Sequence, residues 1–253
     1  MGTISRVLQL SLSSEGESAG VFSRYWEDPQ SVAWRSIPYK PSQNDQKLFQ
    51  RVFHMSTHIV LASGSAVRAQ LLHQAGIGFA VQYPDVNEEV IKTALLAKGA
   101  SPSDIAVALA EEKSIKIASN STGSLVLGCD QVLDFEGRLL SKPENPDQAL
   151  EQLTAMRGKW HMLLSAAVVC RNGEPIWRHV GQVRLRMRDS SDAYLSDYVS
   201  RNWDSIRHAV GAYKLEEEGV RLFSAIDGDY FNVLGLPLME LINFLALQGM
   251  IEQ

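Results

Sequence analysis

The feature that most constrains the fold is an alternation of strand-like and helix-like segments that begins at Ile59. Residues 59–62 (IVLA) are a short apolar run typical of a buried strand. Small residues follow, and a helical pattern over 68–74 then stops at Gly76. A second helix is expected to begin after Ser101 and to end near Ala118, ahead of a central strand over 124–133 (SLVLGCDQVL). This order of segments predicts an α/β domain.

The second half of the chain adds hairpin signals to that alternation. Residues 134–137 (DFEG) form a turn signal, which predicts a short return strand that ends near Lys142. The sequence Arg171-Asn172-Gly173 joins two β-rich runs in the same way. Hairpins pair antiparallel strands, so the sheet is expected to be mixed and flanked by helices. The segments expected here are β-rich runs over 160–170 and 175–187 and helices over 145–158, 190–199 and 238–247.

The first 54 residues differ in character from the rest of the chain. They are rich in Ser, Gln, Pro and charge, and their apolar residues follow neither the helical nor the strand period. One interpretation is a poorly ordered N-terminal extension. The other, which we favour because Met55 stands just before the first strand, is that translation starts at Met55 rather than at Met1. The sequence therefore predicts one α/β domain over residues 55–253.

Charge and apolar content limit the partners that the chain can bind. The net charge of −5 provides no overall attraction to nucleic acid or to an anionic membrane. The sequence contains neither an apolar stretch of about 18 residues nor a basic region followed by an apolar core, so we expect a cytoplasmic protein. Cys129 and Cys170 lie in apolar runs without a C-x-x-C spacing, which predicts buried free thiols.

Residues 63–68 (SGSAVR) lie between a buried strand and a helix, where phosphate groups often bind. The start of a helix presents free backbone N–H groups, to which Ser63 and Ser65 add hydroxyls. Arg68 adds a guanidinium group that suits phosphate oxygens. The alternative is an ordinary helix capped by serine, with a surface arginine.

Asp130 is the most informative charged residue of the sequence. It lies inside an apolar strand, where a carboxylate is costly to bury unless it is paired or used in catalysis. Such a group could ligate a divalent metal or deprotonate water. Glu88 provides a second carboxylate on what reads as a solvated loop, and Lys113 and Lys142 provide positive charge. Together these residues suit phosphoryl chemistry, with a structural role for Asp130 as the alternative.

An ordered set of short motifs resembles the Maf pyrophosphatases. The motifs cover about residues 57–250 and follow the order and spacing of the family. They are IVLASGSAVRAQLL at 59–72, Asn87-Glu88, Glu112-Lys113, GCDQV at 128–132, Ser141-Lys142-Pro143, GKWH at 158–161, Gly211-Ala212-Tyr213 and NVLGLP at 232–237. The resemblance implies an elongated, ITPase-like α/β fold with a long twisted mixed sheet and a cleft between two lobes.

The resemblance also implies an activity, which is hydrolysis of a nucleoside triphosphate to its monophosphate and pyrophosphate with Mg²⁺ or Mn²⁺. It assigns phosphate binding to Ser63 and Arg68, and the hydroxyl of Ser65 at the same helix start is expected to bind substrate with them. Metal binding falls to Glu88 and Asp130, and catalysis to Asp130, Lys113 and Lys142, with Asp130 as the general base. A homodimer is possible, and we expect no nucleic acid or membrane partner.

The substrate branch is indicated by departures from the family pattern. Val67 stands where the branch that acts on dTTP and UTP commonly has a second arginine, and residues 214–217 (KLEE) replace its G-I-Q-G segment. The sequence is more similar to the branch that acts on 7-methyl-GTP, in which Glu216 could favour the positively charged N7-methylated base. The alternatives are a dTTP/UTP pyrophosphatase and a catalytically silent, nucleotide-binding regulator of cell division.

Overall fold

The computed structural model describes residues 23–28, 31–38 and 59–251. The chain divides into two compact units, Met1–Phe53 and His54–Gln253. In the first unit, β1 (Ser23–Asp28) and β2 (Ser31–Pro38) pair as a two-stranded antiparallel sheet. The start predicted at Met55 and the remainder of the N-terminal 54 residues lie outside the described residues.

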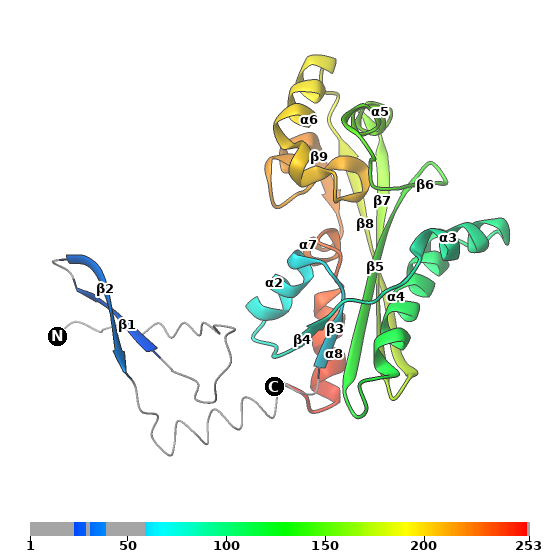
Figure 1. The fold of residues 1–253 in the computed structure, drawn as a ribbon. Coiled ribbons are helices and arrows are strands. Elements are labelled where there is room, and N and C mark those ends of the chain that lie inside the picture. Colours follow the sequence, from blue (N-terminus) through cyan, green and yellow to red (C-terminus); the bar gives the residue numbers. More distant parts are fainter. Residues whose placement is uncertain (1–22, 29–30, 39–58, 252–253) are drawn as a thin grey trace. The chain divides into compact units, whose positions relative to one another are not determined.

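The second unit is built on a seven-stranded mixed sheet with the order β4-β3-β5-β7-β8-β9, and β6 pairs with β5 beside this path (Figure 1). β3 runs parallel to both β4 and β5, whereas every other pair is antiparallel. The predicted mixed α/β class is therefore confirmed. The strands are β3 (Ile59–Ala62), β4 (Ala80–Gln82), β5 (Leu125–Phe135), β6 (Arg138–Leu140), β7 (Trp160–Arg171), β8 (Glu174–Met187) and β9 (Phe223–Asp227).

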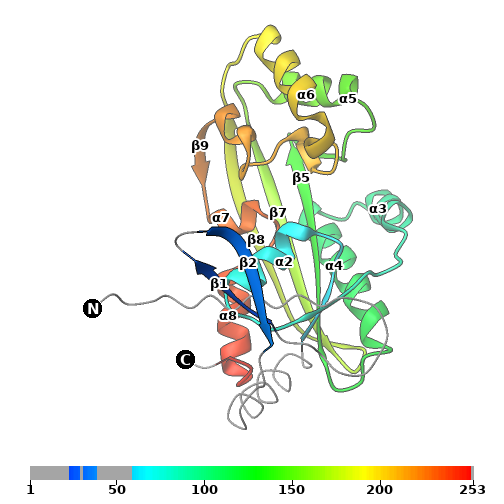
Figure 2. The ribbon, with the colours of Figure 1, turned by 60° about the vertical axis from the view of Figure 1, so that its left-hand side comes forward.

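Helices cover both faces of this sheet and one of its ends. In Figures 1 and 2, α5 and α6 lie at one end of the long strands and α8 lies toward the other. The α-helices are α2 (Ala66–Gln74), α3 (Glu88–Ala97), α4 (Pro102–Ala118), α5 (Pro146–Met156), α6 (Asp192–Ile206), α7 (Tyr230–Val233) and α8 (Leu238–Leu247). Two short 3₁₀ helices, η1 (Val210–Ala212) and η2 (Glu218–Leu222), connect α6 to β9.

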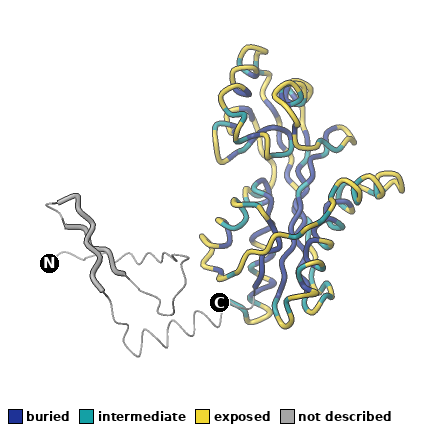
Figure 3. Tube along the Cα trace, viewed as in Figure 1, coloured by how far each residue is buried: buried dark blue, intermediate teal, exposed yellow. Residues whose placement is uncertain are grey.

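Alternate residues of β5 face two different cores, as expected for a strand buried on both faces. Leu125 and Leu127 pack with α2 and α8, whereas Val126 packs with α4 on the opposite face. A third core joins the far ends of β7 and β8 to α5 and α6. The buried strands form the centre of the unit (Figure 3). The first two cores lie on opposite faces of the sheet in one lobe, and the third core forms the other lobe. The two expected lobes are therefore present, while the cleft between them stays a prediction.

The close approach of α4 to β5 depends on a glycine. A Cβ atom built at Gly128 would lie 2.1 Å from the backbone oxygen of Ala110 on α4. Only a residue without a side chain lets the helix lie this close to the strand. Gly128 thus fixes the distance across which a side chain of α4 reaches the neighbouring strand residue, Asp130.

The predicted helix ends are largely confirmed, with two corrections. Ser101 and Asp104 form the expected capping box, and α4 ends at Ala118. However, Glu88 opens helix α3 instead of lying on a loop, and α6 continues to Ile206 rather than ending at Val199. Cys129 and Cys170 are buried free thiols, as predicted. Within the described residues, no helix combines the length and apolar character needed to cross a membrane.

Candidate active site

Lys113 is the centre of a buried charged cluster. It lies on α4, one turn after Leu109, and its side chain is only 10% exposed. Its Nζ lies 2.5 Å from Oδ1 of Asp130 and 2.6 Å from Oε1 of Glu88. A single ammonium group therefore bridges two carboxylates from β5 and α3. The structure brings together three of the residues that the sequence singled out.

The two carboxylates of this cluster differ in their protonation chemistry. Burial raises the pKa of Asp130 above its usual value, and the opposing charges of Lys113 and Arg68 do not offset this effect. Burial also opposes ionisation of Glu88, but the positive charges of Lys113, Lys142 and Arg68 outweigh it and hold its pKa below the usual value. Asp130 is thus the better proton acceptor of the pair, whereas Glu88 stays ionised.

Glu88 is positioned by the start of α3. The side chain of Asn87 caps this helix by accepting a hydrogen bond from the backbone N–H of Val90 at 3.2 Å. The Glu88 side chain is 44% exposed, in contrast to 9% for Asp130. One carboxylate of the cluster is therefore accessible to solvent while the other is enclosed.

Arg68 joins three separate segments of the chain next to Asp130. Its Nε donates to the carbonyl oxygen of Gly235 at 2.8 Å, and its Nη1 donates to Ser63 Oγ at 3.2 Å and to the carbonyl oxygen of Cys129 at 3.1 Å. Ser63 and Arg68 are therefore adjacent, as a phosphate site would require. These bonds also give Arg68 a structural task that the sequence did not reveal.

Ser65 occupies the N-cap of α2. Its Oγ accepts a hydrogen bond from the backbone N–H of Arg68 at 3.3 Å. This is the ordinary capping arrangement that the sequence left open as an alternative. The phosphate-binding role of Ser65 stays a prediction.

Lys142 follows β6 on the exposed side of the cluster. Its positive charge lowers the pKa of Glu88, which places the two groups within electrostatic reach. Within the described part of the chain, its ammonium group makes no hydrogen bond or ion pair. The adjacent Ser141 accepts a hydrogen bond from Lys92 of α3 at 2.9 Å. Lys142 is thus free to meet an anionic ligand, on a loop that is tied to α3.

Glu216 lies on an exposed turn between η1 and η2. The two glutamates that follow it both have partners. Glu217 accepts a hydrogen bond from Ser205 at 2.7 Å, and Glu218 pairs with Arg201 at 2.8 Å. Among the described residues, no partner of the Glu216 carboxylate is found. It is the one unpaired carboxylate of three consecutive glutamates.

A polar network beside Asp130 was not predicted. Gln131 Nε2 donates to Ser165 Oγ at 2.9 Å and to the carbonyl oxygens of Asn232 and Val233, each at 3.0 Å. Ser165 Oγ also donates to the carbonyl oxygen of Asn232 at 2.6 Å. These bonds hold α7 against β5 and β7, and so place the Gly235 carbonyl where Arg68 meets it. The signal for this network was Gln131 itself, a polar residue in an apolar strand.

The donor set of the cluster suits a hard divalent cation. Mg²⁺ is commonly held by one or two carboxylates, with substrate phosphates and water completing its shell. Glu88 and Asp130 are two such carboxylates, and they lie near each other because both contact the Lys113 ammonium group. No group of three or more His, Cys, Asp or Glu side chains that could hold a metal occurs in the described ranges. Water and substrate oxygens would therefore complete the coordination shell of a cation bound here.

Comparisons with known proteins find a matching family model and several relatives. Residues 58–248 match the family model described as "Maf-like protein". A protein of Ruegeria sp. (strain TM1040) named nucleoside triphosphate pyrophosphatase is 68% identical over 199 residues, which cover 79% of this chain and all of the relative. A protein of Brucella abortus named 7-methyl-GTP pyrophosphatase is 39% identical over 198 residues, covering 78% of this chain and all of the relative.

A solved structure resembles the chain more distantly. It is a nucleoside-triphosphatase, or dITP/XTP pyrophosphatase, from Mycobacterium abscessus. The match covers 76% of this chain and 94% of the other, at a TM-score of 0.34 and 17% sequence identity.

Proposed function

We propose a substrate and a set of residue roles for this chain, which belongs to the Maf-like protein family. The chain is a nucleoside triphosphate pyrophosphatase, a hydrolase that acts on acid anhydrides. The proposed substrate is 7-methyl-GTP, and the proposed reaction centre is the cluster of Lys113, Asp130 and Glu88. The observation that carries this centre is the single Lys113 ammonium bridging two carboxylates at 2.5 and 2.6 Å.

Asp130 is the proposed general base. A water molecule attacks the α-phosphorus and forms a new P–O bond. The bond between the α-phosphorus and the oxygen that bridges the α- and β-phosphates breaks. The water proton passes to the Asp130 carboxylate, and the bonding electrons leave with pyrophosphate. Burial, which raises the pKa of Asp130, makes this carboxylate a stronger base than an exposed one. Lys113 keeps it oriented through the bond to Oδ1.

The basic residues of the site have the proposed task of neutralising the triphosphate. Lys142 makes no competing ion pair within the described ranges, and Lys113 is held between the two carboxylates. Ser63 and Arg68 lie together at the start of α2, where the helix dipole favours an anion. The positive charge of these groups would stabilise the negative charge that develops on the leaving group.

Glu88 and Asp130 are the proposed holders of a Mg²⁺ or Mn²⁺ ion. The cation would supply positive charge to the phosphate oxygens. Glu88 suits this task because its pKa is held low and it stays ionised across the neutral range.

Two observations support 7-methyl-GTP as the substrate. The Brucella abortus relative, 39% identical, carries the name 7-methyl-GTP pyrophosphatase. In addition, Glu216 is exposed and unpaired among the described residues, so its negative charge is available to a ligand. Methylation at N7 gives guanine a positive charge, which a carboxylate would favour over a neutral base.

Pyrophosphate release from 7-methyl-GTP, GTP, dTTP and UTP tests this substrate. We expect the highest kcat/KM for 7-methyl-GTP. In Glu216→Gln, the preference for 7-methyl-GTP over GTP should fall about tenfold, which corresponds to about 1.4 kcal/mol. Glu174→Gln, at the exposed β7–β8 hairpin, removes the same charge elsewhere and should leave the preference unchanged. A preference for dTTP or UTP would contradict the proposed substrate, and an unchanged ratio in Glu216→Gln would contradict the role of that residue.

A further inference from the structure

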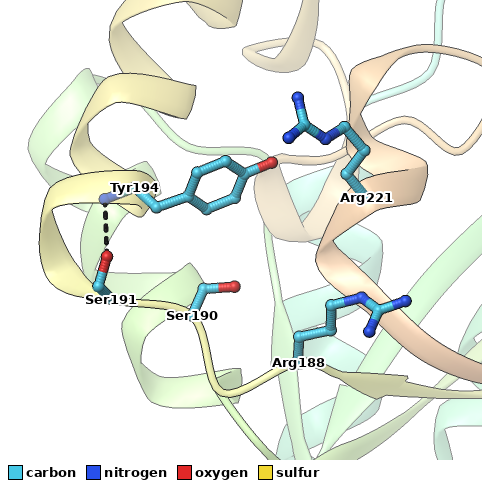
Figure 4. Close-up of a pocket in the computed structure, with 5 residues that line it drawn as sticks. All are labelled: Arg188, Ser190, Ser191, Tyr194 and Arg221. Atoms are coloured by element: carbon cyan, nitrogen blue, oxygen red, sulfur yellow. Dashed lines mark hydrogen bonds between the residues drawn. The ribbon is translucent and has the colours of Figure 1, made fainter.

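A polar cavity lies far from the proposed reaction centre. It has a volume of about 410 Å³ and is lined by Arg188, Ser190, Ser191, Tyr194 and Arg221 (Figure 4). In the sheet, Asp130 of β5 pairs with Ala166 of β7, which in turn pairs with Val180 of β8. Met187 is seven residues beyond Val180, or roughly 23 Å further along the strand. The cavity, which adjoins Arg188, therefore belongs to the other lobe.

Two arginine side chains give this cavity a positive charge that is poorly neutralised. The Arg188 guanidinium has no carboxylate partner among the residues that the structure describes. For Arg221, the recorded carboxylate contact is to Glu218 Oε1 at 3.8 Å. That same oxygen lies only 2.8 Å from Arg201. Neither cavity arginine thus has a close counterion of its own.

The remaining lining groups are unused or partly used hydrogen-bond donors. The hydroxyl oxygen of Tyr194 is buried and has no hydrogen-bond partner in the described structure. In Figure 4 this phenol extends from α6 toward Arg221. Ser191 caps α6 by accepting the backbone N–H of Tyr194 at 3.2 Å, so the positive end of the 15-residue helix dipole lies at the cavity.

Acidic residues near the cavity do not cancel this charge. Asp192 lies 2.5 Å from Arg157, and Asp189 lies 4.0 Å from the same arginine. Both carboxylates are strongly exposed, at 84% and 92% of the side chain. Water and salt therefore screen them, and Arg157 already balances part of their charge.

We propose that this cavity binds the phosphate groups of a small molecule, at a site separate from the reaction centre. Two guanidinium groups, a phenol hydroxyl and a helix N-terminus form a donor set that suits phosphate oxygens. The volume lies within the range of about 300–1,000 Å³ typical of small-molecule sites, so it admits more than one phosphate group. Inorganic pyrophosphate and a nucleoside monophosphate both carry this chemistry, and both are products of a nucleoside triphosphate pyrophosphatase.

Amide NMR on the isotope-labelled full chain tests the site residue by residue. Sodium pyrophosphate, sodium phosphate and GMP are titrated separately in metal-free buffer. We expect saturable shifts in the backbone amides of Ser191, Asp192 and Ala193 with pyrophosphate or with GMP. Tighter binding of one of these two identifies the source of the phosphate group, and either order supports the site. Shifts in the amides of residues 63–65 report the reaction centre separately, so a failure of one site is distinguishable from a failure of the other.

Two double variants then assign the binding to the arginines. Arg188→Gln with Arg221→Gln should weaken binding at least about tenfold, because two charge-assisted contacts are lost. Arg171→Gln with Arg207→Gln removes the same net charge from outside the cavity and should change the dissociation constant by less than about twofold. The absence of saturable shifts at residues 191–193 with all three ligands would overturn the proposal. Equal weakening in both double variants would overturn it as well.

Discussion

Removal of the Lys113 ammonium group should lower the free energy of unfolding, because it leaves the buried Asp130 carboxylate without its ion-pair partner. Lys113→Met keeps most of the side-chain length but leaves the Asp130 carboxylate, 9% exposed, without its contacting cation. Loss of one partner of a buried ion pair costs about 3–5 kcal/mol of folding stability. We expect about 3 kcal/mol at pH 7, at the low end, because Arg68 still acts electrostatically on Asp130.

Urea denaturation with a double-mutant cycle measures this effect. Asp130→Asn is the second single variant, and Lys113→Met with Asp130→Asn completes the cycle. In the double variant, the neutral amide that replaces the Asp130 carboxylate does not need the Lys113 cation. We therefore expect the double change to lower the unfolding free energy by about 2 kcal/mol less than the sum of the single changes. Additive costs would refute the idea that Lys113 and Asp130 act as one buried pair.

The pH dependence of the same Lys113→Met variant gives an independent check with a definite sign. Burial already places the folded-state pKa of Asp130 above its unfolded value, so the folded state binds the proton more tightly. Loss of Lys113 removes a charge that lowers this pKa and should raise it further. The stability of Lys113→Met should therefore recover toward that of the wild type as the pH falls from 7 to 5. A gap that stays constant or widens would contradict this account.

Three further predictions follow from other parts of the structure. Burial lowers the pKa of His161 to about 4, so unfolding takes up a proton at this residue at pH 5, and this histidine alone should reduce the unfolding free energy by about 2 kcal/mol between pH 7 and pH 5. Urea titrations at the two pH values should show this contribution missing in His161→Gln and kept in the exposed His208→Gln. Gly128→Ala places a methyl group against the Ala110 carbonyl and should lower the unfolding free energy by about 2 kcal/mol or more, and an unchanged midpoint in urea would contradict the close packing of α4 on β5. Chelation with EDTA should abolish pyrophosphate release and added Mg²⁺ or Mn²⁺ should restore it, whereas full activity in the chelator would contradict metal binding by Glu88 and Asp130.

Local sequence signals predicted much of the fold because they act over only a few residues. Ser101 and Asp104 are three residues apart, so their capping box could be read directly from the sequence. The spacing of Leu109 and Lys113 likewise placed the lysine beside the apolar face of α4. Strand β4 was not predicted, since its three residues are all exposed and carry no apolar period.

The sequence singled out the residues of the charged cluster but not the contacts that connect them. Asp130 stood out as a carboxylate in an apolar strand, and the structure confirms its burial. Glu88 was assigned to a loop because residues 85–89 read as acidic and polar, although Asn87 is a good helix cap. The bond from Arg68 to Gly235 spans 167 positions of the chain. No local pattern reports such a contact, because it depends on how α7 packs against β5.

The most direct test of the account is pyrophosphate release from 7-methyl-GTP by Asp130→Asn, with Asp204→Asn as a control at an exposed position of α6. If Asp130 is the general base, kcat should fall about a hundredfold or more in Asp130→Asn and stay within about twofold in the control. Circular dichroism should confirm that both variants are folded. A folded Asp130→Asn enzyme that retains the kcat of the wild type would contradict the assignment of the reaction to the cluster of Lys113, Glu88 and Asp130.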